Sequence, residues 1–166
     1  MTDVENTEHR VWNDRKLIQF MRESNRIERE RRINPGDLNA ARMAINTGID
    51  YLADILNIHS ILGRHLNKKW VGKLREVDVR VGPYTPPSHE EVPKLMEKYC
   101  ADLMFMDSWT AHNEFQKIHP FRDLNGRVGR LIWLARAVEE GYKGTIPFLQ
   151  MYYYQTLEKF EDGKIL

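Results

Sequence analysis

The sequence predicts a compact all-α domain that carries one small β-hairpin. Three observations lead to this fold class. Apolar residues recur at spacings of three, four and seven over most of the chain, which is the period of an amphipathic helix. One short stretch alternates with a period of two instead. The 166 residues suffice for a single hydrophobic core, so one domain is expected.

The first half of the chain predicts two long helices. One runs from about Thr7 to Arg31 and carries a single apolar stripe. Asn34 and Pro35 then supply an N-cap and a first-turn proline for a second helix. The apolar stripe of that helix continues to about Leu62, so we expect it to be unbroken to that point.

Between residues 69 and 87 the pattern changes. Val77, Val79 and Val81 alternate with polar residues, and Gly82-Pro83 breaks the run. The segment therefore predicts a short β-hairpin, or flap, inserted between helices.

The second half returns to a helical period. Ser88 with Glu91 three residues later is typical of a capping box, and the helix that follows extends to about residue 104. Further helices are expected over residues 108–118, from Asn125 to Gly141, and from about Pro147 to residue 160. Residues 119–124 form a loop, because proline resists a helix there and aspartate favours a turn.

Composition narrows the function. The formal net charge is +1, so nothing demands a polyanionic partner, and the four tryptophans and the tyrosines are expected in the core and pocket walls. A nucleic-acid partner is therefore not expected. No apolar run approaches the ~20 residues that span a bilayer, and no signal-peptide h-region is present. Cys100 is the single cysteine, which suits a reducing compartment. We expect a cytoplasmic protein without a membrane partner; oligomeric state, a homo-oligomer included, stays open.

Residues 119–130, with the sequence HPFRDLNGRVGR, carry the candidate chemistry. Backbone N–H groups around Asn125 and Gly126 at a helix N-terminus form an anion site, and glycine allows close approach of a phosphate. Arg127 and Arg130 lie three residues apart on one helix face, and guanidinium groups suit phosphate. Asp123 is a hard oxygen ligand for magnesium.

The proton-transfer group in this segment is His119, the residue there that exchanges a proton near neutral pH. Other nucleotide or metal signatures are missing: the sequence has no GxxxxGK[ST] loop, no GxGxxG, no HExxH and no paired CxxC.

This segment resembles the signature of the Fic (filamentation induced by cAMP) family, HPFxDGNGRxxR. The match covers eight specified positions in twelve: His119, Pro120, Phe121, Asp123, Asn125, Gly126, Arg127 and Arg130. The resemblance extends over residues 20–160. It includes a flap at Val81, Gly82, Pro83 and Tyr84, and paired tyrosines of which Tyr153 is placed near the nucleotide base.

The resemblance implies a protein adenylyltransferase, which moves AMP from ATP to a serine, threonine or tyrosine hydroxyl of a target protein. By that analogy His119 is the catalytic base and Asp123 holds Mg²⁺. Loop amides from Leu124 to Gly126, with Asn125, cradle the phosphates, and Arg127 and Arg130 bind the β- and γ-phosphates. Phe121 anchors the loop in the core, and the flap pairs with the target's backbone.

Leu124 departs from the signature, which has glycine at this position. If the position needs a positive φ, leucine is strained there; if not, leucine only packs. Phosphorylating members of the family also lack this glycine, so a protein phosphotransferase on the same fold stays open. A non-catalytic interaction module is the third alternative, against which the intact His119, Asp123, Asn125 and arginines argue.

SNRIER, residues 24–29, resembles the inhibitory motif [S/T]xxxE[G/N] of Fic proteins with an N-terminal inhibitory helix. By this resemblance Glu28 pairs with Arg130 and hinders productive seating of ATP, and Ser24 lies one turn earlier. Residues 1–33 are then an inhibitory region and residues 34–166 the catalytic core, within one domain overall.

Overall fold

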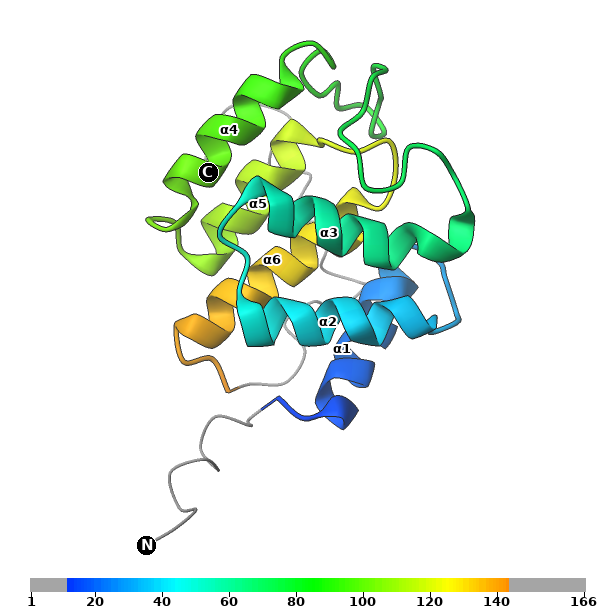
Figure 1. The fold of residues 1–166 in the computed structure, drawn as a ribbon, viewed down its shortest axis with the longest axis vertical. Coiled ribbons are helices and arrows are strands. Elements are labelled where there is room, and N and C mark those ends of the chain that lie inside the picture. The colour runs from blue at the N-terminus through cyan, green and yellow to red at the C-terminus, as the bar shows by residue number, and fades with distance from the viewer. Residues whose placement is uncertain (1–11, 144–166) are drawn as a thin grey trace, which may run out of the picture.

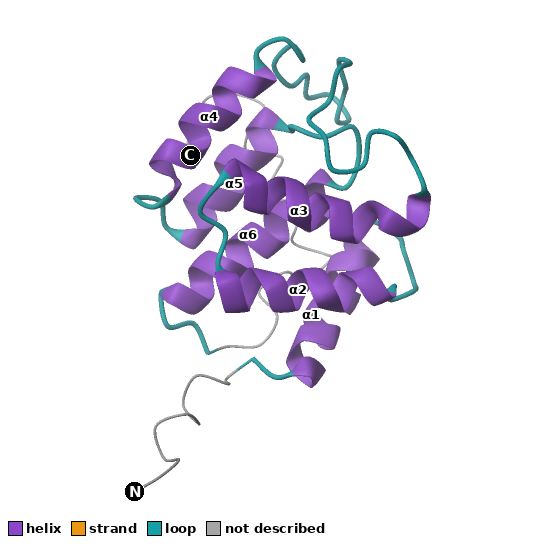
Figure 2. Cartoon of the chain, in the orientation of Figure 1, coloured by secondary structure: helices purple, strands orange, loops and turns teal. Residues whose placement is uncertain are grey.

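The structure, a computed structural model, describes residues 12–143 and consists of helices joined by loops (Figure 1). The helices are α1 (Asp14–Ile27), α2 (Pro35–Thr47), α3 (Leu52–Gly63), the 3₁₀ turn η1 (Arg64–Leu66), α4 (Val92–Leu103), α5 (Ser108–Ile118) and α6 (Asn125–Glu139). Figure 2 shows no strand in the described part of the chain, so the predicted all-α class is confirmed. None of the described helices is long and apolar enough to cross a membrane.

Helix α6 is the centre of the fold. It lies against α5 along its length and also contacts α1, α2 and α3 (Figure 1). Its buried side chains point in all directions, as expected for a helix surrounded by others: Val128, Leu131, Ile132, Trp133, Leu134, Ala135 and Ala137. The N-terminus of this central helix therefore has a fixed position, and the loop before it is anchored at that end.

Helix α1 is shorter than the predicted span from 7 to 31, of which residues 7–11 lie outside the described part. It begins at Asp14 because Asn13 caps it, accepting the N–H of Lys16 at 3.1 Å. It ends at Ile27, after which Arg29 takes a left-handed conformation with φ 59°. Leu17, Phe20, Met21 and Ile27 are buried in the common core, so α1 is part of the domain.

The long helix predicted up to Leu62 is in fact two helices. Gly48 has φ 73°, a conformation that glycine adopts without strain and that turns the chain away from α2. Asp54 then accepts the N–H groups of Asp50 and Tyr51, at 3.1 and 2.9 Å, and so starts α3. The apolar spacing alone does not reveal the break, because it continues in phase across the turn.

The predicted β-hairpin is reduced to one turn. Residues 77–80 form no strand, and a single antiparallel bridge joins Val81 to Tyr84 around Gly82-Pro83, with N–O distances of 2.9 and 3.0 Å. The carbonyl of Val77 bonds to the side chain of Arg75 in place of a partner strand. The valine alternation faces no second strand, and Val77 stays 41% exposed.

The remaining predictions fall close to the observed elements. Helices α5 and α6 begin at the predicted residues. Glu91 accepts the N–H of Ser88 at 3.3 Å, but α4 itself begins later, at Val92. The helix predicted after Pro147, with Tyr153, lies outside the described residues.

The contact between α2 and α3 depends on the absence of a side chain at Gly36. A Cβ atom there would lie 2.4 Å from the backbone oxygen of Ile61, which cannot move without displacing α3. Gly36→Ala should therefore lower the free energy of unfolding by about 1–3 kcal/mol, although alanine is the better helix former. Denaturant unfolding measures this change. Asn39→Ala at an exposed position of the same helix is the control, and equal stability of the two variants would contradict the prediction.

Candidate active site

The loop between α5 and α6 is closed by one buried side chain. Asn125 is 2% exposed; its Oδ1 accepts the N–H of Phe121 and its Nδ2 donates to the carbonyl of Phe121, both at 2.8 Å. The amide thus takes the place of a paired backbone segment and fixes the loop's shape. The side chain predicted to help cradle phosphates is committed to the loop itself, which leaves the backbone N–H of Asn125 for a ligand.

Phe121 anchors the loop in the core, as predicted, and is fully buried. Its ring stacks on His59 of α3, with centroids 3.8 Å apart and planes at 3°. The Nδ1 of His59 accepts the N–H of Gly72 at 2.8 Å, so Nε2 carries the proton and donates to the carbonyl of Asp123 at 3.2 Å. Sequence reasoning missed His59, because a single histidine on an apolar helix face gives no signal of this contact.

Leu124 resolves the question raised by its departure from the signature. Its φ is 69°, so leucine occupies a left-handed conformation that costs about 1–2 kcal/mol. Burial of the side chain, 3% exposed, offsets this cost by a similar amount. The N–H of Leu124 is not turned to a ligand here, because it donates to Oδ1 of Asp123 at 2.6 Å.

The two arginines that were predicted as equivalent neighbours differ in burial. Arg127 is half-buried, whereas the side chain of Arg130 is fully buried. Arg130 donates from Nε to Oγ of Ser24 at 2.8 Å and from Nη2 to the carbonyl of Ser24 at 3.0 Å. The same Nη2 lies 2.7 Å from Oε1 of Glu28. The structure therefore brings Ser24, Glu28 and Arg130 together, from opposite ends of the sequence.

The carboxylate of Glu28 also lies on the first turn of α6. A Cβ atom on Gly126 would be only 2.2 Å from Oε1 of Glu28. The N–H groups of this first turn have no acceptor within the helix, and the helix dipole favours negative charge there. The first turn of α6 thus lies beside a carboxylate supplied by the chain itself, and that carboxylate pairs with the guanidinium of Arg130.

His119 closes α5 and begins the loop, in a left-handed conformation with φ 50°. Burial lowers the pKa of its imidazole from 6.5 to about 4, and the positive charge of Arg75 acts in the same direction. A hydrogen bond to the backbone of Gln116 and the charges of Glu28 and Asp123 oppose the shift. The ring is therefore neutral at physiological pH and able to accept a proton.

The flap residues lie beside this histidine. Val81, Gly82 and Pro83 are exposed, while Tyr84 is half-buried and donates from its hydroxyl to the carbonyl of Lys117 at 2.7 Å. Lys117 is two residues before His119, so the hydroxyl of Tyr84 attaches the flap to the end of α5. The bridge turn is thus fixed at its base and open to solvent at its tip.

Asp123 is exposed at the tip of the loop. Among residues 12–143 no three histidine, cysteine, aspartate or glutamate side chains gather into a metal site. Magnesium held by one carboxylate and substrate phosphates needs no such group, so a single carboxylate beside an anion site fits that mode of binding. Tyr153, predicted near the base, lies outside the described residues.

Fold and loop together define a class: a helical domain whose central helix begins at a loop that opens with a buried, neutral histidine and whose first turn lies beside a carboxylate and a buried guanidinium. The Fic/DOC family model matches residues 49–135, more than half of the chain. The chain therefore belongs to the Fic/DOC family.

Curated relatives carry the name protein adenylyltransferase Fic. The protein from Culex quinquefasciatus is 30% identical over 125 residues, which are 69% of this chain and 25% of that protein. The one from Nematostella vectensis is 29% identical over 123 residues, 68% of this chain and 29% of that protein. The chain thus spans between a quarter and a third of the length of these relatives.

Solved structures show the same fold. A Fic-1 structure from C. elegans has a TM-score of 0.69 at 19% identity and covers 99% of this chain and 60% of that one. A Fic domain containing signaling protein from Bacteroides thetaiotaomicron has a TM-score of 0.67 at 20% identity, covering 89% and 71%. A Fic family protein from Desulfovibrio desulfuricans has a TM-score of 0.61 at 25% identity, covering 76% and 49%.

The closure of the loop by Asn125 is testable. Asn125→Ala removes both hydrogen bonds and leaves the N–H and C=O of Phe121 buried without partners, so the free energy of unfolding should fall by about 2 kcal/mol or more. Denaturant unfolding measures the loss. Asn46→Ala, at an exposed position of α2, should leave stability nearly unchanged, and equal values for the two variants would show that the amide does not hold the loop.

Buried histidines make the stability depend on pH. Burial lowers the pKa of His59 and of His112 to about 4, below the unfolded value of 6.5. As the pH falls below 6.5 the unfolded chain therefore takes up protons first. Their contribution is fully present above that pH and is lost as the pH falls toward 4. Each histidine should lower the free energy of unfolding by about 2 kcal/mol between about pH 8 and pH 5.

Denaturant midpoints at the two pH values test this dependence. His59→Gln should reduce the difference between them, whereas His65→Gln at an exposed position should leave it unchanged. A wild-type stability that is flat over this pH range would overturn the assignment of these histidines as buried and neutral.

Proposed function

We propose that this chain is a protein adenylyltransferase that moves AMP from ATP to a hydroxyl side chain of a target protein, and that its own N-terminal helix inhibits it. The observation that carries the proposal is the carboxylate of Glu28 on the first turn of α6, 2.7 Å from the buried Arg130. A position that holds one anion against a helix N-terminus and a guanidinium is suited to the phosphates of ATP.

In this proposal each residue of the site has a role that follows from its surroundings. The N–H groups at the start of α6, together with Arg127 and Arg130, bind the phosphates. Asp123 would hold Mg²⁺ together with those phosphates, and the ion would supply positive charge against them. Phosphate transfer depends mainly on such positioning and charge stabilisation.

His119 acts on the attacking group. The hydroxyl oxygen of the target bonds to the α-phosphorus of ATP, the bond to the β-phosphate oxygen breaks, and pyrophosphate leaves. The neutral imidazole takes the hydroxyl proton, and the negative charge of bound phosphates raises its pKa from the low value that burial imposes. The flap, with Val81, Gly82, Pro83 and Tyr84, aligns the target backbone beside this histidine.

Glu28 acts as the brake in this proposal. Its carboxylate lies where an anionic ligand meets the first turn of α6 and Arg130, and Ser24 holds the same guanidinium from the preceding turn of α1. ATP whose γ-phosphate competes with Glu28 for Arg130 is bound in an unproductive arrangement. Residues 1–33 are then a regulatory region, and residues 34–166 carry the chemistry.

A phosphotransferase is the second candidate, and the leucine at position 124, where the signature has glycine, is the observation that favours it. The backbone of Leu124, with φ 69°, has the left-handed conformation that glycine also adopts, so the difference from the signature lies in the side chain. The position of the label in ATP distinguishes the two reactions.

The test uses Glu28→Gly with ATP labelled at the α- or the γ-phosphate, incubated with cell lysate. Transfer of α-label to protein should rise by roughly tenfold or more over the wild type, because the variant frees Arg130. His119→Ala added to Glu28→Gly should lower transfer by about 10²–10⁴-fold while ATP binding persists.

Glu23→Gly is the matched control, since it removes a carboxylate from the same helix that pairs with the exposed Arg26. It should leave transfer at the wild-type level. Label from γ-ATP alone would establish the phosphotransferase. No label from either position in the Glu28→Gly protein would favour a non-catalytic interaction module, and no gain over wild type would remove Glu28 as the brake.

A further inference from the structure

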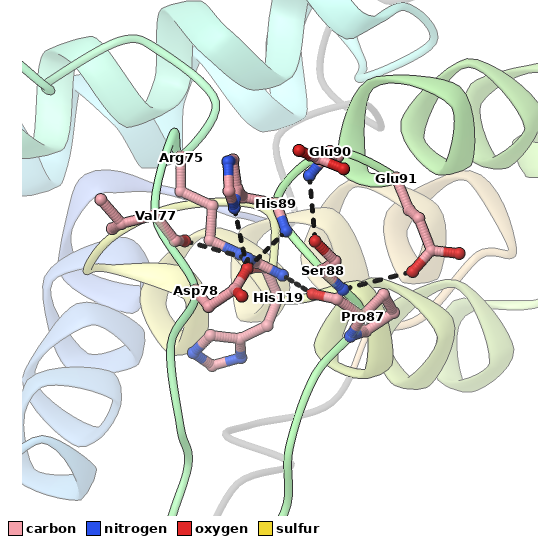
Figure 3. Close-up of polar contacts among 9 residues, drawn as sticks. All are labelled: Arg75, Val77, Asp78, Pro87, Ser88, His89, Glu90, Glu91 and His119. Carbon is pink, nitrogen blue, oxygen red and sulfur yellow. Dashed lines mark hydrogen bonds and ion pairs between the residues drawn. The ribbon is translucent and has the colours of Figure 1, made fainter.

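A buried guanidinium joins the base of the flap to the loop between α5 and α6. The side chain of Arg75 is fully buried, and each of its three nitrogens donates to a backbone carbonyl (Figure 3). Nε donates to His119 at 2.8 Å, Nη1 to Val77 at 3.0 Å and Nη2 to Pro87 at 2.5 Å. One side chain therefore holds the loop, the chain entering the flap and the chain leaving it.

The backbone of Arg75 adds a fourth contact. Its N–H donates to the carbonyl of Pro120 at 2.9 Å, so Arg75 binds two consecutive carbonyls of the loop. These are the carbonyls that follow the left-handed turn at His119, a conformation that is strained for an L-residue. Two hydrogen bonds, one of them charge-assisted, are enough to offset that strain.

The carboxylate nearest to this guanidinium is held on the opposite segment. Oδ1 of Asp78 lies 3.7 Å from Nη1 of Arg75. It also accepts the backbone N–H of His89 at 2.7 Å and lies 2.9 Å from Nδ1 of the same residue (Figure 3). Asp78 is 69% exposed and screened by water, so it neutralises the buried charge only in part.

We propose that Arg75 is a positioning residue that holds the flap and the imidazole of His119 in one fixed arrangement, so that a hydroxyl aligned by the flap meets the base. This inference deepens the proposed function and rests on it. Arg75 acts through His119 and the flap backbone. A lysine cannot replace it, because a single ammonium does not reach three carbonyls in the directions of a guanidinium fork.

The charge of Arg75 has a second effect on the same histidine. Burial and then Arg75 lower the pKa of His119, while the backbone of Gln116, Glu28 and Asp123 raise it. A cation at this place therefore helps to keep the imidazole neutral and ready to accept a proton. Geometry and charge can be separated by substitution, since lysine keeps the charge without the fork and glutamine keeps donors without the charge.

The experiment compares Arg75→Lys, Arg75→Gln and Arg75→Met, each in the Glu28→Gly protein. Amide hydrogen exchange at Val81, Tyr84 and His89 should accelerate by roughly tenfold or more in the lysine and methionine variants, with α6 amides unchanged. In an NMR titration the pKa of His119 should rise above its value in the parent protein in the glutamine and methionine variants, and stay at that value with lysine, because lysine alone keeps the charge that lowers the pKa.

Transfer assays add the functional readout. In the lysine variant the rate of label transfer to protein should fall at least tenfold, while the Kd for ATP changes less than about twofold, because Arg75 lies outside the phosphate site. Arg64→Met, which removes an exposed arginine from η1, is the matched control.

A folded lysine or methionine variant whose flap amides exchange as in the parent would overturn the proposal. A folded glutamine or methionine variant in which His119 titrates as in the parent would overturn it too. A rise of α6 exchange in step with that of the flap would also overturn it, since that marks general destabilisation. If the methionine variant does not fold, the lysine and glutamine variants decide. If the Glu28→Gly parent transfers no label, the proposed function fails, and exchange and titration still test Arg75 by themselves.

Discussion

The arrangement of α1 on the central helix depends on one buried cation, the guanidinium of Arg130. A charge inside the core is tolerated only when hydrogen bonds and a counter-charge surround it. Ser24 and Glu28 provide these, and both belong to α1. The position of α1 against the central helix is thereby specified to within one turn, and with it the position of the carboxylate at the N-terminus of α6. Packing, electrostatics and the proposed regulation meet at this one contact.

Most of the helices could be predicted from the sequence, because amphipathic periodicity and capping residues act locally. Pro35, Ser108 and Asn125 begin helices where their chemistry indicates. The failures have a common cause. The break at Gly48 leaves the apolar spacing in phase, and the valine alternation at 77–81 is a strand pattern without a second strand. Whether an extended segment pairs is decided by its neighbours in space, and here Arg75 bonds to the carbonyl of Val77 instead.

The candidate site, like the fold, could be predicted where its chemistry is local in sequence and not where it depends on contacts in space. The residues of the segment 119–130 were identified because their chemistry is concentrated in one stretch. Their surroundings were not: His59 and Arg75 are distant in sequence and act through backbone carbonyls, which any residue supplies. Sequence also could not choose between the two conformations considered for Leu124. The loop begins and ends with a left-handed residue, His119 and Leu124, and this strain is sustained by contacts with His59 and Arg75 and by the side chain of Asn125.

The burial of α1 limits how the proposed brake can be released. Leu17, Phe20, Met21 and Ile27 are each no more than 1% exposed, and returning four such side chains to water costs about 6–12 kcal/mol as an upper estimate. That is as large as the whole stability of a domain of this size. Helix α1 therefore does not leave the core as a rigid body to release the brake. A rotamer change of Glu28, whose side chain is 35% exposed at the end of the helix, keeps these contacts in place, and such a change is fast, reversible and small enough for ATP itself to select.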